Sequence, residues 1–433
     1  MARDVDALLG TVNEHRQAGD ICRSIGIVDN QVQSGSLNWH AVQAPFLDNA
    51  KRAFYSRRES DTSGKYGAEI VKNAILGTIK LILCAKPNGS TPLASRGDAS
   101  GDGLADIVLT GGIGWRTMPL AASNGDGTFR VTNTGVADFP VYAQQAGAVP
   151  VTGDFDGDGK SDVALTAGTN WGSIPVAFSK GDGSYRVTNI NSPSFPFWAQ
   201  YSPVKPVAGD FNGDGRSDIA VIGGLLPLVA IAFSNGDGTF HTKITFLFDF
   251  AAFAAQPGAK PVAGDFNGDG RWDLALTGGA GWASVPVAFS NGDGTFRVTN
   301  NGLSDFPGFA QQAGATPVAG DFNGDGLGDI ALTGGATWGS IPVAFSNGDG
   351  NFSVANNWVD DFPVYAQQAG ATPVAGDFNN DGRTDIALTS GAGWGSIPVA
   401  FSNGDGEFSV TNNWVDDFPI YAQQAGVKPV GGP

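Results

Sequence analysis

The chain alternates short apolar runs with turns rich in Gly, Asn and Asp, and this pattern recurs along most of its length. One unit passes from the apolar run at 317–319 through an Asp-rich turn. It continues through the segments DIALTGG from Asp329, SIPVAFS from Ser340 and FSVAN from Phe352. These runs have the length and the flanking turns of β-strands, and DIALTGG has the alternation of a half-buried strand. Each unit is therefore predicted to contain four strands.

The Asp-rich turn returns at a nearly constant interval. Its first aspartates are 55 or 56 residues apart, at Asp98, Asp154, Asp210, Asp265, Asp321 and Asp377. A period near 50 residues is typical of propellers and arrays, and no unit shows helical periodicity. We therefore expect an all-β fold, a six-bladed β-propeller of four-stranded antiparallel blades over residues 85–433. A linear β-array or β-solenoid is the alternative.

The two ends of the chain bear on how the ring closes. Residues 423–430 repeat the lead-in to a further unit and then stop. Such a spare strand is expected to pair beside the first blade and close the ring non-covalently. Residues 1–84 are different in character, and we expect an N-terminal arm of unknown function that is partly helical over residues 4–17. A divergent seventh blade in this region is the alternative.

Composition limits the classes of partner. The net charge of −17 disfavours nucleic acid and anionic membranes. Two cysteines, Cys22 and Cys84, exclude a disulfide scaffold, and one bridge or a reduced pair both remain open. The three histidines occupy no repeated position, which excludes a repeated His-based catalytic site. The N-terminus lacks the apolar core of a signal peptide and no 18-residue apolar stretch exists, so we expect a cytoplasmic protein without a membrane span. Non-classical export remains open.

The Asp-rich turn follows the pattern Asp-x-(Asp/Asn)-x-Asp-Gly-x-x-Asp, which places oxygens at alternate positions of a tight loop. Such loops bind hard cations, so structural Ca²⁺ is one prediction, and the second repeat is the best candidate because it has the most carboxylates. Asx turns that bond their own backbone are the alternative. The candidate ligands are Asp154, Asp156, Asp158, Asp162, Asp210, Asn212, Asp214, Asp218, Asp265, Asn267, Asp269, Asp273, Asp321, Asn323, Asp325, Asp329, Asp377, Asn379, Asp381 and Asp385.

Strand order predicts which loops share a face. In a four-stranded blade the Asp-rich loop and the SNGDG turn lie on one face, whereas the loop that usually holds a Trp and the DFPVYAQQAG link lie on the other. A tryptophan recurs in this loop, and the link to the next blade carries Asp, an aromatic residue and Gln. Aromatic faces pack on the C–H side of sugars, and Asp and Gln bond sugar hydroxyls. The candidate sugar-binding residues are Trp115, Trp171, Trp282, Trp338, Trp394, Asp138, Tyr142, Gln144, Gln145, Trp198, Asp305, Gln311, Gln312, Asp361, Tyr365, Gln367, Gln368, Asp417, Tyr421 and Gln423.

A structural explanation competes with the sugar hypothesis at these positions. A tryptophan in each blade can fill the wedge between blades, and we expect Phe139, Phe306, Phe362 and Phe418 to do so rather than bind. Link Asp and Gln side chains can cap strand ends. Arg130, Arg186 and Arg297, in the fourth strands, are weaker candidates for contact with a ligand.

The nine-residue Asp signature within a blade-length repeat resembles the FG-GAP or integrin-α type repeat. The NGDGTF turns at 124–129 and 291–296 and the aromatic links resemble, more narrowly, the mushroom FG-GAP-type propeller lectins over residues 85–433. This resemblance implies a non-enzymatic, multivalent fungal lectin that binds terminal N-acetylglucosamine in pockets between adjacent blades. The chain departs from the pattern where the first loop, GDASGDG, lacks the Phe and where the third repeat lacks the loop Trp.

Two other functions compete with the lectin. An enzyme that uses the central channel should break the repeat with unique His, Glu or Arg residues, yet the third blade, which departs most, changes to apolar residues such as Leu225 and Leu226. An integrin-like, calcium-stabilised propeller that binds proteins should carry an unrepeated exposed patch. The apolar run from Phe246 to Phe253 fits such a patch or a homodimer contact. We expect the lectin.

Overall fold

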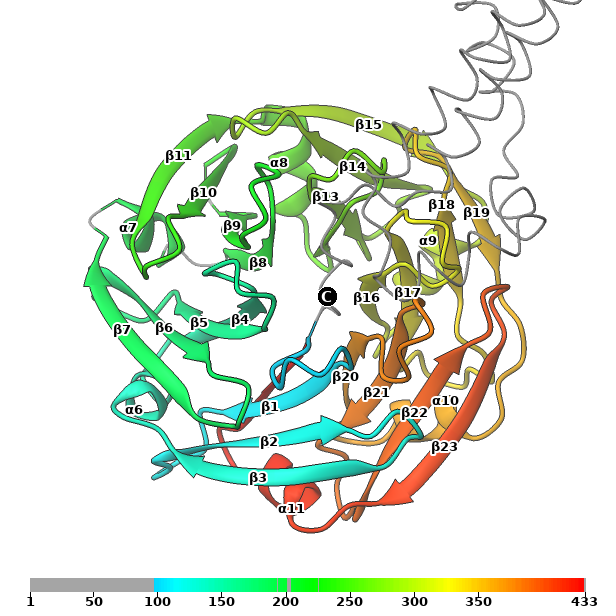
Figure 1. Ribbon diagram of the computed structural model, residues 1–433. Helices are drawn as coiled ribbons and strands as arrows, with labels where there is room; N and C mark the ends of the chain where they lie inside the picture. The colour runs from blue at the N-terminus through cyan, green and yellow to red at the C-terminus, as the bar shows by residue number, and fades with distance from the viewer. Residues whose placement is uncertain (1–96, 193, 201–203, 225, 432–433) are drawn as a thin grey trace, which may run out of the picture. The chain divides into compact units, whose positions relative to one another are not determined.

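Each repeat folds as one four-stranded antiparallel sheet, and six such blades surround a central channel within the part of the chain that the structure describes (Figure 1). The structure is a computed structural model, and it describes residues 97–431 except 193, 201–203 and 225. The predicted all-β, six-bladed propeller is confirmed, and the linear array and the solenoid are wrong. The predictions for residues 1–84, including the arm, its helix and both cysteines, lie outside the described residues.

In the second to sixth blades the strands run from the channel outward in sequence order, and in the first blade the C-terminal strand lies innermost. The innermost strands are β24 (Lys428–Val430), β4 (Val149–Gly153), β8 (Lys205–Gly209), β12 (Lys260–Gly264), β16 (Thr316–Gly320) and β20 (Thr372–Gly376). The second strands are β1 (Asp106–Thr110), β5 (Asp162–Thr166), β9 (Asp218–Ile222), β13 (Asp273–Thr277), β17 (Asp329–Thr333) and β21 (Asp385–Thr389). The third strands are β2 (Thr117–Ser123), β6 (Ser173–Ser179), β10 (Leu228–Ser234), β14 (Ser284–Ser290), β18 (Val343–Ser346) and β22 (Ser396–Ser402). The outer strands are β3 (Phe129–Gly135), β7 (Tyr185–Asn191), β11 (Phe240–Phe246), β15 (Phe296–Gly302), β19 (Phe352–Ala355) and β23 (Phe408–Trp414).

The ring closes in the first blade, which takes its innermost strand from the C-terminal end of the chain. The strand β24 pairs antiparallel with β1, with Val430 opposite Val108, as the spare lead-in predicted (Figure 1). The first blade also bonds directly to the sixth, since the Ser123 hydroxyl donates to the Phe378 carbonyl at 2.8 Å. Because the first and sixth blades touch, the ring has no place for a seventh blade, and that alternative is wrong.

The second strands are buried on both faces. All five residues of each second strand are buried, as in the DIALT strand β17. The half-buried alternation expected for these strands is therefore wrong, because neighbouring blades pack on both sides of each sheet. The cores lie between blades and include phenylalanines of the Asp-rich loop and of the link, such as Phe322 and Phe362, which are fully buried. Phe139, Phe306 and Phe418 are equally buried and fill the wedge between blades, as expected.

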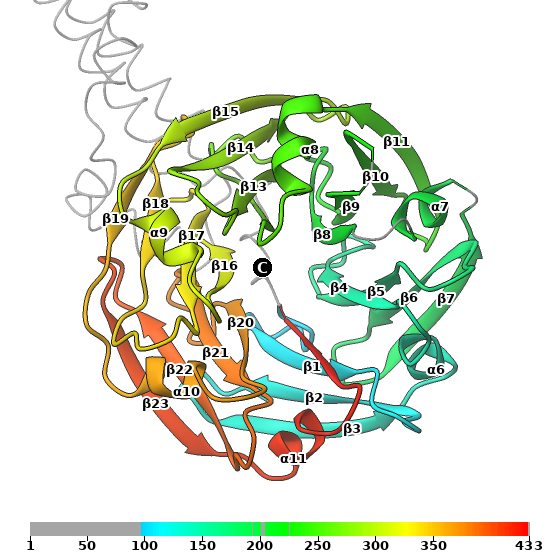
Figure 2. The same ribbon diagram turned by 180° about the vertical axis from the view of Figure 1, so that it is seen from behind.

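Short helices occupy the links between blades, and Figure 2 shows them most openly. They are α6 (Phe139–Ala143), α7 (Phe195–Ala199), α8 (Phe248–Ala254), α9 (Phe306–Ala310), α10 (Phe362–Ala366) and α11 (Phe418–Ala422). A proline in the first turn fits five of them, because that position needs no backbone N–H. Helices of five to seven residues are too short to show an amphipathic period, so the sequence pattern did not predict them. None of the helices described is long and apolar enough to cross a membrane.

Candidate functional site

The two loop faces predicted from strand order are present. On one face the Asp-rich loop meets the SNGDG turn, where the Arg271 Nε donates to the Ser290 carbonyl at 3.2 Å. On the other face the Trp loop meets the link, where the Trp394 Nε1 donates to the Gln368 Oε1 at 2.7 Å. The candidate sugar residues therefore lie on the face that carries the helices.

The loop tryptophans are held by the fold. Each indole N–H donates to a link glutamine at 2.7 to 2.9 Å, in the pairs Trp115–Gln424, Trp171–Gln145, Trp282–Gln256, Trp338–Gln312 and Trp394–Gln368. Each ring also packs edge-on against a link aromatic, in the pairs Trp115–Tyr421, Trp171–Tyr142, Trp282–Phe253, Trp338–Phe309 and Trp394–Tyr365. A Cβ on the glycine three residues before each tryptophan would overlap the indole ring, as a Cβ on Gly391 would overlap the ring of Trp394. These contacts give the five tryptophans a packing role between blades.

In five of the six links, the first glutamine bridges the link to the Trp loop of the same blade. The Gln144 Nε2 donates to the carbonyls of Trp115 and Pro140, at 3.0 and 2.7 Å, and its Oε1 accepts from the Gly114 N–H at 2.8 Å. The same bonds recur at Gln200, Gln311, Gln367 and Gln423. These amide groups already have hydrogen-bond partners within the fold, as the structural explanation for the link glutamines expects.

A pocket opens between the sixth and first blades on the helix-bearing face. Its volume is about 360 Å³, and it is lined by Phe129, Val131, Asn133, Trp414, Val415, Asp416, Asp417 and Tyr421. The pocket brings together two sequence-predicted residues, Asp417 and Tyr421, with one that the sequence analysis did not select, Trp414. The Trp414 side chain is 74% exposed, so one face of its indole is free for a ligand.

The Trp414 ring is fixed in place although it is exposed. Its Nε1 donates to the Asp416 Oδ1 at 2.9 Å. A Cβ on Gly395 would overlap the ring, so the indole lies directly on that glycine. An exposed ring held from below and at its edge is preorganised to stack on a ligand.

Asp417 has an unusual backbone. Its φ is +59° and its ψ is −38°, and the Phe418 N–H donates to the Asp416 carbonyl at 2.6 Å, which is the bond of a classic γ-turn. This conformation is rare and strained for a residue with a side chain. The same turn is centred on Asp361 and Asp305, whereas Asp138 has an ordinary helical φ of −50°. The strain is therefore confined to three of the links.

The gap between the fifth and sixth blades repeats the residues of this pocket. Trp358 is 76% exposed, its Nε1 donates to the Asp360 Oδ1 at 3.0 Å, and Asp361 and Tyr365 follow. The segment NNWVDDFP occurs twice, at 356–363 and 412–419. The equivalent position in the other blades holds Gly135, Asn191, Phe246 or Gly302. A search of the sequence for residues that depart from the repeat would have found Trp358 and Trp414.

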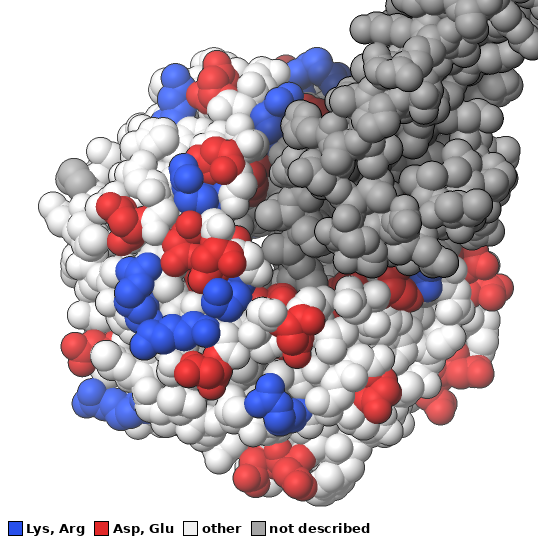
Figure 3. Space-filling model, in the orientation of Figure 1, with Lys and Arg blue, Asp and Glu red and all other residues white. Residues whose placement is uncertain are grey.

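The Asp-rich loops of the later repeats satisfy their own oxygens. The Asp210 carboxylate accepts backbone N–H bonds from Gly213 and Gly215, at 2.7 and 2.8 Å. Asp214 pairs with Arg216, and the equivalent pairs are Arg271–Asp269 and Arg383–Asp381. Figure 3 shows acidic and basic side chains adjacent to one another on this face. These bonds are those of the Asx-turn alternative.

A comparison with protein-family models identifies the family of the repeat. The FG-GAP-like repeat model matches residues 98–165, 154–221, 265–332 and 321–388, together more than half of the chain. The chain belongs to the FG-GAP-like repeat family. No curated protein sequence matches it.

Solved structures resemble this FG-GAP-like protein in fold. An Agrocybe aegerita lectin, described for its specific recognition of non-reducing terminal N-acetylglucosamine, is 23% identical with a TM-score of 0.52, covering 78% of this chain and 84% of its own. A Photorhabdus luminescens Tc holotoxin pore is 17% identical with a TM-score of 0.43, covering 69% of this chain and 13% of its own. AofleA from Arthrobotrys oligospora is 12% identical with a TM-score of 0.38, covering 78% of this chain and 97% of its own. The first likeness supports the propeller fold, and the two lower scores add nothing to it.

The second FG-GAP-like repeat differs from the others. Oxygens of Asp154, Asp156 and Asp162 lie within 4.8 Å of one another. The Asp156 Oδ1 is buried and has no hydrogen-bond partner among the described residues. Burial raises the pKa of all three carboxyls, that of Asp162 most strongly, and the neighbouring carboxylates raise them further. Converging carboxylates with an unpartnered oxygen fit a hard cation such as Ca²⁺.

Proposed function

We propose that this protein is a lectin, and that its principal sites are the pockets at Trp414 and Trp358 between adjacent blades. The observation that carries the proposal is the pocket between the sixth and first blades. It combines an exposed, fixed indole with the carboxylates of Asp416 and Asp417, the Tyr421 ring and the Asn133 amide.

This set of groups suits a pyranose. The indole face can stack on the C–H side of the ring or on an acetamido methyl, and the carboxylates can accept from hydroxyls. The Asp417 carboxylate and the Tyr421 hydroxyl form no hydrogen bond within the described residues, so both are open to a ligand. We propose terminal N-acetylglucosamine as the sugar. The resemblance to the mushroom propeller lectins supports that choice.

Two equivalent sites on one ring favour multivalent ligands. A single shallow site of about 360 Å³ would bind weakly. Two sites that reach the same glycan surface would raise the apparent affinity by about 10²- to 10⁴-fold without any new contact. We therefore propose that the protein binds glycan-coated surfaces rather than isolated sugars.

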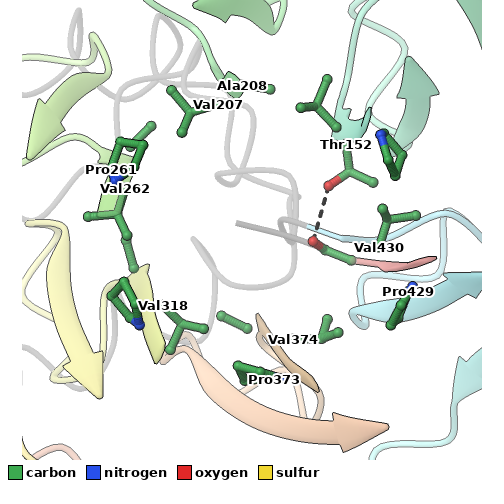
Figure 4. Close-up of a pocket in the computed structure, with 17 residues that line it drawn as sticks. Thr152, Val207, Ala208, Pro261, Val262, Val318, Pro373, Val374, Pro429 and Val430 are labelled. Carbon is green, nitrogen blue, oxygen red and sulfur yellow. Dashed lines mark hydrogen bonds between the residues drawn. The ribbon is translucent and has the colours of Figure 1, made fainter. Parts of the chain in front are cut away.

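We further propose that the protein is not an enzyme. The central channel is lined by the Pro-Val-Ala runs of the innermost strands, and its volume is about 230 Å³ (Figure 4). Among the described lining residues, the polar side chain is that of Thr152, whose hydroxyl donates to the Gly431 carbonyl at 3.1 Å. A channel walled by methyl groups and prolines offers no general acid or base.

A glycan array with the purified protein tests the lectin proposal. The wild type should bind glycans that end in N-acetylglucosamine selectively, and the Trp358→Ala, Trp414→Ala double variant should bind none of them. The Trp282→Phe variant is the matched control, because Trp282 lies in the fourth blade, away from both pockets. Absence of binding to every glycan would overturn the proposal and favour the integrin-like, protein-binding propeller.

We also propose that Ca²⁺ binds the second-repeat loop at Asp154, Asp156 and Asp162 as a structural ion. The matched variant is Asp156→Asn, because Asn stands at the equivalent position of the later repeats. Millimolar Ca²⁺ should raise the unfolding temperature of the wild type above its value in EDTA, and the shift should vanish in the variant. An equal shift in both proteins would show that the ion acts elsewhere, and no shift in the wild type would remove the proposal.

A further inference from the structure

A second pocket lies between the second and third blades and has a different chemistry. Its volume is about 360 Å³, and its described lining residues are Phe197, Trp198, Val204, Val221, Gly224, Leu226 and Leu228. None of these carries a charged, hydroxyl or amide side chain. The described lining lacks the carboxylate and amide groups that the Trp414 pocket offers to sugar hydroxyls, so this pocket is not another copy of the lectin site.

The pocket lies where the other blades place a tryptophan ring. Gly224 is the third-blade equivalent of Gly112, Gly168, Gly279, Gly335 and Gly391. At each of those five glycines, an added Cβ would overlap the indole of the loop tryptophan. The loop of the third blade is one residue shorter, because the Leu247 N–H donates to the Pro227 carbonyl as the Leu303 N–H donates to the Ala283 carbonyl. Leu226 therefore stands in place of that tryptophan, and it lines the pocket together with Gly224. The cavity therefore occupies the space that an indole fills elsewhere in the ring.

The walls of this space are preformed. Val221 and Leu228 form the floor and belong to the core between these blades, at 2% and 7% exposure. Phe197 and Leu226 form the rim and are about half exposed. The Phe197 and Trp198 rings meet edge-on with centroids 5.2 Å apart, which fixes an aromatic wall on the side of α7.

We propose that this pocket binds a neutral, planar aromatic group of about the size of an indole. The ring would lie over Gly224, as the loop tryptophans lie over the equivalent glycines, and would contact the aromatic wall and the aliphatic floor. A preformed apolar cavity of 150 Å³ already admits benzene, so a cavity of about 360 Å³ has room for two fused rings. The described lining carries no charged, hydroxyl or amide side chain, which disfavours ionised or highly hydroxylated ligands.

Titration of the full-length protein with indole, monitored by ligand-observed NMR and by calorimetry, tests this proposal. The wild type should bind one indole saturably, and glucose should not compete. The Leu226→Trp variant restores the repeat residue and should fill the pocket, and Gly224→Leu should block it from the opposite side. Each variant should weaken indole binding by at least about tenfold, which corresponds to about 1.4 kcal/mol.

A cooperative thermal unfolding transition near that of the wild type serves as the control for folding. If both variants unfold in this way but no longer bind indole, the aromatic site is established. If the wild type shows no saturable indole binding, or if both folded variants retain it, the proposal is overturned. This readout is separate from the lectin proposal, because indole binding does not depend on the sugar pockets.

Discussion

Replacing Trp414 by alanine should abolish one sugar site at a small cost in stability. A fully buried tryptophan removes roughly 150–250 Å² from water. At 74% exposure, Trp414 buries about a quarter of that in the fold, which at ~25 cal/mol per Å² is worth about 1–1.6 kcal/mol. Trp338 is 9% exposed, and the same substitution there should cost about 3–5 kcal/mol.

The loss in sugar binding should exceed what stability explains. A pyranose stacked on the free indole face would cover on the order of 80 Å² of apolar surface, worth about 2 kcal/mol or roughly 30-fold in affinity. For a weak site, that loss puts binding beyond the range of a titration. The number of sugars bound should therefore fall from two in the wild type to one in Trp414→Ala, and to none when Trp358→Ala is added.

Calorimetric titration with a soluble N-acetylglucosamine oligomer measures this stoichiometry, and thermal unfolding measures stability in parallel. The Gly395→Ala variant separates the position of the ring from its presence, because the new Cβ would displace the Trp414 indole without removing it. Gly395 lies outside the left-handed region, so alanine adds no backbone strain there. If Trp414→Ala kept two sites at unchanged affinity, the assignment of this pocket would be refuted.

Three further predictions concern the fold around the sites. Trp282→Phe should lower stability by about 1 kcal/mol, because the partly buried Gln256 amide loses its indole partner. It should leave glycan affinity unchanged, and reduced affinity would restore the loop tryptophans as sugar ligands. Burial raises to about 8 the pKa of Asp218, Asp273, Asp329 and Asp385. Since these carboxyls ionise near 4 in the unfolded chain, the folded protein holds more protons between these values, so stability should fall as pH rises from about 4 to 8, by about 1.4 kcal/mol per pH unit and group at most. Unfolding temperatures that rise from pH 5 to pH 8 would show that the backbone N–H bonds to these carboxylates outweigh desolvation. Ser123→Ala should destabilise the closure between the first and sixth blades by about 1–3 kcal/mol, because the buried Phe378 carbonyl loses its donor; chemical denaturation checks it, and a change below 0.5 kcal/mol would count against this bond.

The sequence predicted the architecture because the evidence for it is repeated. Six copies of the Asp-rich turn at a constant interval define the blades, and the unpaired lead-in at 423–430 predicts the pairing of β24 with β1. The burial of β17 on both faces was missed because an alternating strand looks half-buried until its neighbours are known. The sequence period defines the length of a blade. Whether the second face of its sheet is buried depends on how the neighbouring blades pack.

The sequence alone could not choose between two roles for the loop tryptophans and the link glutamines, for a physical reason. A link glutamine near a tryptophan is chemically able to bind a sugar or to bond the indole N–H, and the choice depends on distance. In the structure the Gln368 Oε1 lies 2.7 Å from the Trp394 Nε1, so the pair serves the fold. The repetition that revealed the blades also drew attention to these repeated Trp–Gln pairs. A residue that recurs in nearly every blade is expected to serve the packing of the blade before it serves a ligand.

The residues that break the repeat carry the functional proposals. Trp358 and Trp414 add exposed rings at a position that is Gly or Asn in three of the other blades, and each sits beside a doubled aspartate with a strained γ-turn. Leu226 replaces the ring in the third blade and leaves a cavity over Gly224. Trp414 ends β23 and still pairs with Ser396, and Trp358 forms the equivalent bridge to Ser340, so the added rings leave the strand pairing at these positions intact. Leu226 lies in the loop before β10. A propeller can therefore acquire binding sites one gap at a time, by adding a ring where the repeat has none or by deleting one that the repeat supplies.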